Sequence, residues 1–418
     1  MKKVLIISYY WPPSGGSGVQ RWLKFSKFLP KYGIKPYVYT PKNPTIELID
    51  NELTKQISND VTVWKKKIYE PYSIKNMFSK KSKKTETSGV ISNSKFGFIF
   101  NWIRGNFFIP DPKVLWIKPS INYLEKKLTE NSIDTIISTG PPHSMHLIAL
   151  ALKNKLNLKW IADFRDPWSN FVQNKFLNKL ESTRIKHENK ENLVLKFSDA
   201  ILTTSKSLNK EFKLKNHNTF YTPSGFESFI KPKAYNKFRI LYAGSMKEFQ
   251  NPINLWIALK ELIESDISFK DLVEIVLIGN IDKNIIENKE FRLLQNTKII
   301  SYLSKDNLDK EISISELLLV CSVNVEGSND IIPGKFYHYL SSGKKILGIS
   351  NRGTDLEKII KETKSGMSFS YDNHADLKNY IYKCFSDYKD GKVNNQKTDD
   401  KSLSLNIAKN ISEIISKL

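Results

Sequence analysis

A basic, glycine-containing segment in the second half of the chain has the residue types of a phosphate site. Residues 328–350 read S-N-D-I-I-P-G-K-F-Y-H-Y-L-S-S-G-K-K-I-L-G-I-S, which predicts a loop, a helix that begins at Pro333–Gly334, and a buried strand. A helix N-terminus offers free backbone N–H groups and a partial positive charge to an anion. We therefore expect Gly334 and Lys335 to bind phosphate; the alternative is a solvated lysine on an ordinary helix.

A second segment with such residues opens the chain. The apolar run Lys3–Ser8 is typical of a central parallel strand, and the loop Y-Y-W-P-P-S-G-G-S-G follows it before a helical pattern. Gly15 and Gly16 would let a ligand approach the backbone at the carboxyl edge of a sheet. Neither the dinucleotide fingerprint nor the P-loop motif is present, so a glycine-rich turn without a ligand is the alternative.

A third segment, L-Y-A-G-S-M-K-E-F-Q-N-P at residues 241–252, predicts a strand, a short loop and a helix that begins at Pro252. Gly244 and Ser245 would offer backbone N–H groups to a phosphate, and Lys247 would offer a positive charge. Together with Gly334 and Lys335, these residues would give one sheet edge two cationic positions, which suits a pyrophosphate.

Two loops of the first half contain residues that could transfer a proton. They are S-T-G-P-P-H-S-M-H at 138–146 and A-D-F-R-D-P-W-S at 162–169. His143, Asp163, Arg165 and Asp166 would supply a proton acceptor, an orienting carboxylate and an anion clamp. The alternative is that His143 caps the next helix and that the two aspartates pair with Arg165. The motifs of hydrolase triads and zinc sites are missing, so neither of those two interpretations has support.

The elements that must position these residues alternate between strand and helix, which predicts an α/β fold with two doubly wound parallel sheets of about six strands each. The expected strands are Lys3–Ser8, Lys35–Thr40, Thr135–Ser138, Lys159–Asp163, Ala200–Thr204, Thr219–Tyr221, Arg239–Ala243, Val273–Ile278, Lys298–Ser301, Leu317–Cys321, Lys345–Ser350 and Met367–Ser370. The expected helices lie near 18–31, 117–131, 144–156, 175–197, 205–213, 252–264, 305–312, 333–342, 354–364 and 375–388.

The length of 418 residues predicts two domains rather than one. We expect an N-terminal domain at 1–222, a linker at 223–236, a C-terminal domain at 237–390, and a tail with a final helix at 391–418. The apolar stripe of that helix needs a partner, and the N-terminal domain is one possibility.

An insertion at about 70–118 interrupts the alternation of the first domain. It joins the basic run K-K-S-K-K to an aromatic segment that shows little helical or strand period. A basic loop beside an aromatic one is typical of a membrane interface or an amphipathic acceptor, which Trp102, Arg104 and Trp116 would contact. The alternative is that the aromatic residues pack on the N-terminal domain.

The net charge of +22 raises the question of nucleic-acid binding. Only seven of the 65 basic residues are arginine, and readout of base edges depends on arginine. We therefore expect no nucleic-acid partner, and favour an anionic membrane surface or an anionic substrate. The two cysteines, the short apolar stretch at the N-terminus and the lack of a long apolar run predict a cytoplasmic protein.

Several of these motifs together resemble the glycosyltransferases of the GT-B fold. The segments Y-Y-W-P-P-S-G-G, R-G-N-F-F-I-P-D, T-G-P-P-H-S, D-F-R-D-P-W and P-G-K-F-Y-H-Y-L-S-S-G-K-K-I-L are similar to glycosyltransferase family 4, in its bacterial surface-polysaccharide branch. The resemblance covers nearly the whole chain. It is moderately specific for the fold and the class of donor, and poorly specific for the sugar.

The resemblance implies that a sugar is transferred from a nucleotide diphosphate sugar with retention at the anomeric carbon. The first domain would bind the acceptor and the second the donor, and neither a metal nor another cofactor would be needed. Gly244, Ser245, Lys247, Gly334 and Lys335 would hold the leaving diphosphate. Gly15 and Gly16 would face the donor phosphates and the acceptor, and His143 would lie near the sugar.

The chain departs from the family pattern at three places. Asp330 and His338 stand where the family has two glutamates, Ser245 stands where it has arginine, and Asn251 lies near the position of a lysine. The resemblance assigns Asp330 to a sugar hydroxyl and His338 to a ribose hydroxyl.

The sequence thus predicts a glycosyltransferase that is peripheral at the inner face of the cell membrane. It would build a surface polysaccharide, such as capsule or lipopolysaccharide, on a lipid-linked or other glycan acceptor. The alternatives are a GT-B sugar-nucleotide epimerase and a catalytically silent GT-B module that binds a glycan or a partner protein.

Overall fold

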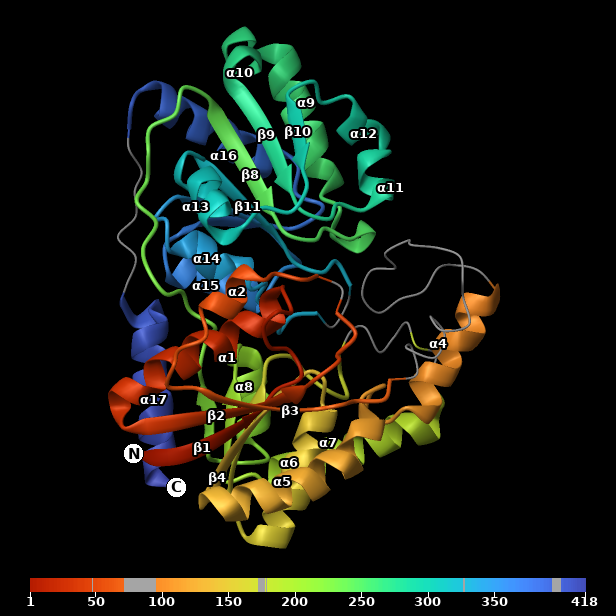
Figure 1. Ribbon diagram of the computed structural model, residues 1–418. Coiled ribbons are helices and arrows are strands. Elements are labelled where there is room, and N and C mark those ends of the chain that lie inside the picture. The colour runs from red at the N-terminus through yellow and green to blue at the C-terminus, as the bar shows by residue number, and fades with distance from the viewer. Residues whose placement is uncertain (47, 71–94, 172–176, 178, 326–327, 393–399) are drawn as a thin grey trace. The chain divides into compact units, whose positions relative to one another are not determined.

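The computed structural model contains two units, and each is built around one parallel β-sheet (Figure 1). The structure describes residues 1–46, 48–70, 95–171, 177, 179–325, 328–392 and 400–418. Unit 1 consists of Met1–Pro223 and Ser404–Leu418, and unit 2 consists of Ser224–Leu403. The chain therefore leaves unit 1 once and returns to it only for its last helix.

The sheet of unit 1 has seven strands in the order β3-β2-β1-β4-β5-β6-β7, and all neighbours run parallel. The apolar residues Val4–Ile7 of β1 are buried on both faces, as expected of a central parallel strand. The strands are β1 (Lys2–Ile7), β2 (Ile34–Pro41), β3 (Thr62–Lys66), β4 (Thr135–Gly140), β5 (Lys159–Phe164), β6 (Ala200–Thr203) and β7 (Thr219–Tyr221).

Helices cover both faces of this sheet. On one face α1 packs beside α17, whose residues Ile407, Ala408 and Ile411 are fully or almost fully buried (Figure 1). On the other face α5 and α6 pack against the sheet together with Trp116. The helical segments are α1 (Ser17–Phe28), η1 (Leu29–Tyr32), α2 (Glu52–Lys55), α4 (Lys95–Phe107), η2 (Val114–Trp116), α5 (Ile117–Asn131), α6 (Ser144–Leu156), α7 (Glu181–Phe197), α8 (Lys206–Lys213) and α17 (Ser404–Lys417).

The sheet of unit 2 has six parallel strands in the order β10-β9-β8-β11-β12-β13. These strands are β8 (Phe238–Ala243), β9 (Val273–Ile278), β10 (Thr297–Ile300), β11 (Leu317–Cys321), β12 (Lys345–Ile349) and β13 (Gly366–Phe369). The helical segments are η4 (Glu248–Gln250), α9 (Ile253–Ser265), α10 (Ile267–Leu272), α11 (Lys283–Ile286), α12 (Lys289–Arg292), α13 (Lys305–Ser313), α14 (Lys335–Leu340), α15 (Asp355–Glu362), α16 (Ala375–Lys389) and η5 (Asp400–Ser402). The predicted fold class, two doubly wound parallel sheets, is confirmed.

The elements that differ from the sequence prediction include β3, α4 and α14. The edge strand β3 was not expected, because its residues T-V-W-K-K mix charged and apolar positions and are only partly buried. The aromatic segment at 95–107 forms the helix α4 although it shows little helical period. Helix α14 begins at Lys335 and has only six residues, so it is shorter than the expected 333–342. The basic run at 80–84 lies outside the described residues.

Candidate functional site

The carboxyl edge of the unit 2 sheet has a switch point between β8 and β11. The chain order runs outward from β8 to β9 and β10 on one side, and from β11 to β12 and β13 on the other. In open α/β sheets, ligands bind at the carboxyl ends of the strands where the order reverses in this way. Here β8 ends at Ala243 and β11 at Cys321, and the residues next to these two ends form the candidate donor site.

Lys335 is the main cation at this edge. Its ammonium nitrogen lies 3.5 Å from the centre of the Tyr242 ring. A Cβ built on Gly244 would lie 3.1 Å from the same Nζ atom, so the amine rests directly against the backbone at Gly244. Among the described residues no carboxylate pairs with Lys335. The arrangement leaves a half-buried cation at the end of β8 whose charge no described residue neutralises.

Burial lowers the pKa of Lys335 to about 7, although the neighbouring Cys321 thiol favours the charged form. A lysine loses its proton more readily when its ammonium is withdrawn from water without a partner. The approach of an anion would restore the positive charge. The site is therefore poised to bind an anion and to take up a proton as it does so.

The backbone around Lys335 only partly matches the sequence prediction. The N–H of Gly244 donates to the carbonyl of Ile278 at 2.7 Å, so it is not free for a phosphate, and its predicted role as a donor is wrong. Ser245 is exposed and its N–H donates to no described residue, while its carbonyl accepts a hydrogen bond from the Tyr242 hydroxyl at 2.6 Å. Gly334 is also exposed, but α14 is too short for a large dipole.

Two residues that the sequence prediction missed hold this edge in place. The N–H of Ala243 donates to the Tyr339 hydroxyl at 2.7 Å, which ties the end of β8 to α14. Tyr242 carries the ring beneath Lys335. The spacing of Lys335 and Tyr339, four residues apart on one helix, was the available signal because such residues share a face.

The other residues that the sequence predicts to bind the nucleotide sugar lie near this edge, and each has different partners. Lys247 precedes η4, and its N–H donates to Gln250 Oε1 at 3.1 Å while its ammonium pairs with no described carboxylate. Asp330 is half-buried in the loop before α14. His338 lies on α14, and its Nε2 atom is 2.5 Å from Asp309 Oδ1 on α13.

In unit 1 the predicted catalytic role of Asp163 is wrong. Its two carboxylate oxygens accept hydrogen bonds from Arg21 Nη2 at 2.7 Å, Trp22 Nε1 at 2.7 Å and Thr139 Oγ1 at 2.7 Å. Although burial opposes ionisation, Arg21 and these donors hold the pKa of Asp163 below its usual range. Asp163 is fully buried, and its role is to fasten α1 to the sheet.

Arg165, which the sequence predicts to be an anion clamp, holds three backbone carbonyls. Its guanidinium donates to the carbonyls of Gly18 at 2.7 Å and Gly140 at 3.3 Å, and also to that of Pro141. These contacts join the first turn of α1 to the end of β4 and to the loop after it. Asp166, next in sequence, is half-buried and makes no hydrogen bond to another described residue. Burial raises the pKa of Asp166, although Arg165 opposes the shift.

His143 is packed rather than free to move. Its ring stacks on Trp168 with centroids 4.8 Å apart and planes at 5°, and only 7% of the residue is exposed. The Nδ1 atom of His143 and the Nε2 atom of His146 have no hydrogen-bond partner among the residues that the structure describes. Burial holds the pKa of His143 well below its ordinary value. His143 therefore stays neutral, and it can exchange hydrogen bonds but does not carry a charge.

Asp111 fixes the loop that carries His143. It accepts hydrogen bonds from the backbone N–H of Ser144 at 2.9 Å and from the Ser144 hydroxyl at 2.8 Å, which caps the first turn of α6. The capping role that the sequence reading gave to His143 as an alternative thus belongs to Asp111. The segment R-G-N-F-F-I-P-D is a structural support of the loop after β4.

In the glycine-rich loop after β1, some of the backbone already bonds to another part of the chain. The N–H of Gly15 donates to the carbonyl of Leu48 at 2.7 Å, and a Cβ on Gly15 would clash with the Leu48 side chain. Gly16 is exposed, has a φ of 90° that favours glycine, and donates no hydrogen bond within the described residues. Of the two predicted residues, only Gly16 has a backbone N–H open to a ligand.

No protein-family model matches the sequence, and no curated protein matches it either. Solved structures do match over the full length. Anabaena HepE, solved in complex with UDP and glucose, has a TM-score of 0.64 and 12% identity, with 100% of both chains covered. The chain has the GT-B fold.

Two further GT-B structures show how broad this likeness is. The lipopolysaccharide outer core galactosyltransferase WaaB, in its apo form, has a TM-score of 0.58 and 14% identity over 100% of both chains. A putative UDP-N-acetylglucosamine 2-epimerase from Listeria monocytogenes has a TM-score of 0.59 and 11% identity, covering 100% of this chain and 96% of that one. The GT-B fold therefore does not by itself choose between a transferase and an epimerase.

The three residues of the insertion that the sequence predicts to contact a membrane or an acceptor differ in how deeply they are buried. Trp116 is fully buried and stacks on Tyr39 with ring centroids 4.8 Å apart, so its predicted contact with a membrane or acceptor is wrong. Trp102 is half-buried on α4 and packs edge-on against Phe107, which is 68% exposed. Arg104 is half-buried on the same helix, and burial together with the charge of Arg104 lowers the pKa of Lys179 to about 8.

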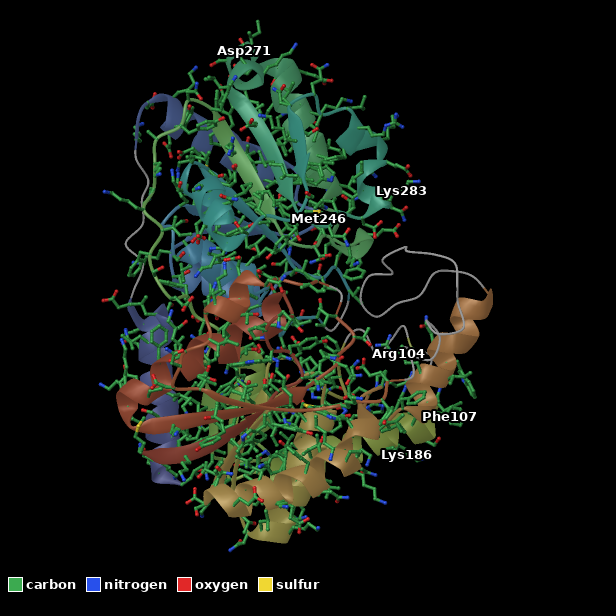
Figure 2. The ribbon with its side chains drawn as sticks, viewed as in Figure 1. Arg104, Phe107, Lys186, Met246, Asp271 and Lys283 are labelled. Carbon is green, nitrogen blue, oxygen red and sulfur yellow. The ribbon has the colours of Figure 1, made fainter. Side chains whose placement is uncertain are left out.

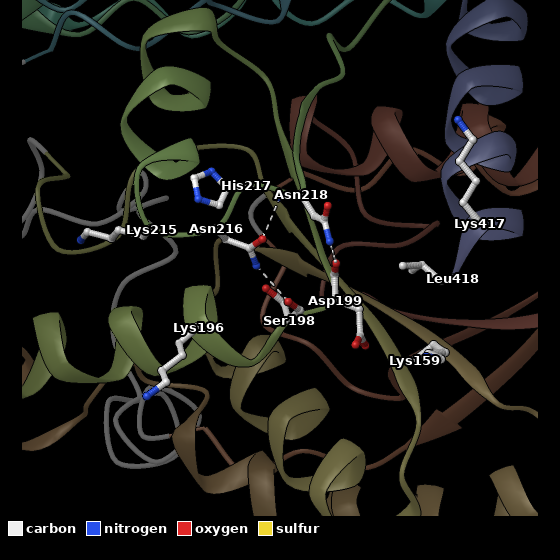
Figure 3. Close-up of a pocket in the computed structure, with 10 residues that line it drawn as sticks. All are labelled: Lys159, Lys196, Ser198, Asp199, Lys215, Asn216, His217, Asn218, Lys417 and Leu418. Carbon is white, nitrogen blue, oxygen red and sulfur yellow. Dashed lines mark hydrogen bonds between the residues drawn. The ribbon is translucent and has the colours of Figure 1, made fainter.

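A basic hollow of about 600 Å³ lies at the opposite, amino-terminal edge of the unit 1 sheet (Figure 3). Asp199 lies in it and is bound to Lys153 and to the N–H of Trp160. Lys196 and Lys215 extend in different directions rather than toward a common point. The hollow is thus an open surface depression away from the strand ends where GT-B proteins bind ligands.

Two observations bear on metals and membranes. Within the described ranges, no group of three or more histidine, cysteine, aspartate or glutamate side chains could hold a metal ion. No helix among the described residues is long and apolar enough to span a bilayer.

Proposed function

We propose that this protein transfers a sugar from a nucleoside diphosphate sugar to a hydroxyl group of an acceptor, with the donor bound at the β8–β11 edge of unit 2. The observation that carries this proposal is the ammonium of Lys335, held against Gly244 without a carboxylate partner. A diphosphate is the ligand chemistry that such a cation favours. HepE, which has the same fold, was solved with UDP and glucose bound.

The chemistry assigned to this edge is electrostatic. When the bond between the anomeric carbon and the phosphate oxygen breaks, the departing diphosphate gains a negative charge. Lys335, and Ser245 through its free N–H, would stabilise that charge without a metal ion, which supports transfer by charge stabilisation. Following the family resemblance, we propose that the new bond keeps the original anomeric configuration.

Unit 1 is assigned to the acceptor. Among the described residues at its carboxyl edge, those that keep unused hydrogen-bonding capacity include His143, Asp166 and the N–H of Gly16. They suit hydroxyl groups of a sugar, since a neutral imidazole and a carboxylate both accept hydrogen bonds. We propose a lipid-linked or other glycan acceptor, in the assembly of a cell-surface polysaccharide.

An exposed apolar surface in unit 1 supports the proposal of a lipid-linked acceptor. Ile185, Leu193 and Phe197 form a stripe along the outside of α7, each between 43% and 48% exposed. Leu180 precedes the helix, and its N–H donates to Asn106 on α4 at 2.8 Å, which brings exposed Phe107 next to the stripe. Figure 2 shows Arg104, Phe107 and Lys186 in this region of unit 1. We call Phe107, Leu180, Ile185, Leu193 and Phe197 the α7 stripe.

The charges beside the α7 stripe favour an anionic lipid surface. The exposed cations Arg184, Lys186 and Lys196 are on the same helix, and the exposed acids Glu181 and Glu188 only partly offset them. A peripheral helix of this kind combines apolar burial with attraction to anionic headgroups. We propose peripheral binding at the inner face of the cell membrane.

An epimerase is the second candidate function, because a putative epimerase shares the fold at a similar TM-score. Both activities need the diphosphate site, so Lys335 does not separate them. They differ in what happens to a nucleotide sugar without an acceptor: an epimerase converts it to its epimer, and a transferase leaves it unchanged or slowly hydrolyses it. Incubating UDP-N-acetylglucosamine with the protein alone and resolving the products tests this alternative.

The experiment that tests the proposal is thermal unfolding of the purified protein against UDP, GDP, ADP and CMP and their common sugar conjugates, without added metal. A ligand at ~100 times its dissociation constant adds about 2.7 kcal/mol of stability, which corresponds to a few degrees for domains of this size. We expect one base to raise the unfolding temperature. A folded protein that responds to none of these ligands would contradict the proposal and favour a silent binding module.

A further inference from the structure

Lys179 is a half-buried lysine of unit 1 to which the proposed function gives no role. Its Nζ atom lies 3.1 Å from Nε2 of His187. The other nitrogen of that ring, Nδ1, accepts a hydrogen bond from the indole N–H of Trp168 at 3.0 Å. His187 and Trp168 are both almost fully buried. The three side chains therefore form one series of contacts that runs inward from Lys179.

The directions of these hydrogen bonds determine the charge of Lys179. An indole N–H only donates, so Nδ1 of His187 must hold a lone pair, and the hydrogen of the neutral ring must lie on Nε2. The Nε2–H group then donates to Nζ of Lys179. An ammonium group has no lone pair and cannot accept this hydrogen bond, whereas a neutral amine can. In the arrangement that the structure shows, Lys179 is therefore a neutral amine.

The surroundings of Lys179 favour the same form. Arg104 comes from α4, and Arg184 comes from the first turn of α7. Burial together with the positive charges of these two residues lowers the pKa of Lys179 from its ordinary value of 10.5 to about 8, although the carboxylate of Asp111 opposes the shift. The hydrogen bond from His187 stabilises the neutral amine as well.

A neutral lysine is a nucleophile, because its lone pair can attack a carbonyl carbon. An ordinary lysine is almost entirely charged near neutral pH and reacts slowly for that reason. Lys179 holds the neutral form in a much larger fraction, and it gives up the hydrogen bond from His187 when its lone pair attacks. The guanidinium groups of Arg104 and Arg184 would also attract a reactant that carries a phosphate group.

We propose that Lys179 is a site of covalent acylation whose reactant is an acyl phosphate, with Arg104 and Arg184 attracting the phosphate group. The amine nitrogen forms an amide bond to the carbonyl carbon. The bond between that carbon and the phosphate oxygen breaks, the phosphate leaves with the electron pair, and the proton lost by the amine passes to the phosphate. This inference goes beyond the proposed function and needs no nucleotide sugar.

Acylation would also affect the inner end of the series of contacts. The nitrogen of an amide does not accept hydrogen bonds, so the Nε2–H group of His187 loses its acceptor at Lys179. His187 anchors Trp168, and the ring of His143 stacks on Trp168 with centroids 4.8 Å apart. Modification of Lys179 would therefore weaken the support of the His143 ring.

The test is acetylation of the folded, full-length protein by acetyl phosphate at pH 7.5, followed over time by peptide mass spectrometry. Lys186, which is exposed on α7, is the internal reference. We expect Lys179 to be acetylated at least about tenfold faster than Lys186, because each unit by which a pKa falls increases the neutral fraction about tenfold. Equal rates for the two lysines, or a slower reaction of Lys179, would overturn the inference.

An uncharged reagent separates the reactivity of the amine from the attraction of the phosphate. With the N-hydroxysuccinimide ester of acetic acid, Lys179 should still react faster than Lys186, but by a smaller factor than with acetyl phosphate. An equally large factor with both reagents would overturn the assignment of an acyl phosphate as the reactant.

Two variants test the influence of the neighbouring charge. Arg184→Gln should slow the acetylation of Lys179 several-fold, since loss of a nearby positive charge favours the charged amine. Lys196→Gln, an exposed change further along the same helix, is the matched control and should leave the ratio of the rates of Lys179 and Lys186 unchanged. Equal effects of the two variants would overturn the role of Arg184.

A spectroscopic measurement gives an independent readout of the hydrogen-bond directions. In the ¹⁵N spectrum of the full-length protein at pH 9, assigned with His187→Gln, His187 should be neutral and carry its hydrogen on Nε2. Acetylation of Lys179 should shift these signals, because the acceptor of the Nε2–H group changes. A hydrogen on Nδ1 in the unmodified protein would overturn the inference.

Discussion

The charge state of Lys335 connects one side chain to a measurable pH dependence. Burial lowers the pKa of this amine to about 7 in the free protein. Below that pH the amine is already charged, and a diphosphate binds without a change of protonation. Above it a proton must be taken up on binding. Affinity should therefore be greatest below pH 7 and fall as the pH rises through 7.

We predict that the dissociation constant of the preferred nucleoside diphosphate increases between pH 7 and pH 9, approaching tenfold per unit as the limit for one required proton. Calorimetry in two buffers of different ionisation enthalpy should detect proton uptake in this range. The matched control is Lys335→Arg, whose guanidinium stays charged and should bind without this pH dependence. The prediction fails if the unaltered protein and Lys335→Arg show the same pH profile.

Gly140 shows how closely the residues of unit 1 are fitted. A Cβ built there would lie 2.6 Å from His146 Nε2 and 2.8 Å from His143 Nδ1. Both imidazoles are at least nine-tenths buried and cannot withdraw into solvent. Gly140→Ala should therefore displace both rings and lower the free energy of unfolding of unit 1 by ~1–3 kcal/mol, the usual penalty for overpacking. Urea denaturation followed by tryptophan fluorescence measures this, and a loss below about 0.5 kcal/mol, the usual effect of an unconstrained substitution, would argue against it.

Helix α6 depends on a residue from outside its own loop. Asp111 satisfies the N–H and the hydroxyl of Ser144 in the first turn of the helix. Asp111→Ala should strand these groups and lower the free energy of unfolding of unit 1 by ~1–3 kcal/mol. Urea titration should show this loss, whereas Asp60→Ala, a change at an exposed position, should alter stability by less than about 0.5 kcal/mol. Equal effects of the two changes would refute the capping role.

The strands and helices could be predicted from local patterns, and the roles of individual side chains mostly could not. The end of β8 next to Gly244 follows from a short apolar run in the sequence. The position of Lys335 at the start of a helix follows from the Pro-Gly pair before it. The sequence predicts a catalytic role for Asp163, and it cannot indicate the ion pair with Arg21 because Arg21 lies 142 residues away. The sequence predicts that Trp116 contacts a membrane or an acceptor, since no local pattern indicates that its ring stacks on Tyr39. Long-range contacts of this kind leave no trace in the spacing of residues.

At the scale of the whole molecule, the α7 stripe predicts where the protein meets a lipid surface. The intact protein should sediment with vesicles of phosphatidylcholine mixed with phosphatidylglycerol, and only weakly with phosphatidylcholine alone. Phe107→Ser combined with Leu193→Ser should weaken this binding at least tenfold, since each large apolar side chain contributes ~1.5–3 kcal/mol when fully buried. Ile267→Ser, an exposed change in unit 2, is the control. Equal sedimentation of both variants would place the lipid contact elsewhere.

The return of the chain to unit 1 has a consequence for its biosynthesis. The apolar side of α1 is covered by α17, and residues 404–418 are translated only after residues 224–403. At the usual pace of protein synthesis this interval lasts ~10–40 s. Throughout it, the side of α1 that packs on α17 lacks that partner in the nascent chain. A ribosome-associated chaperone has time to bind there, and release of that chaperone would have to precede the docking of the last helix.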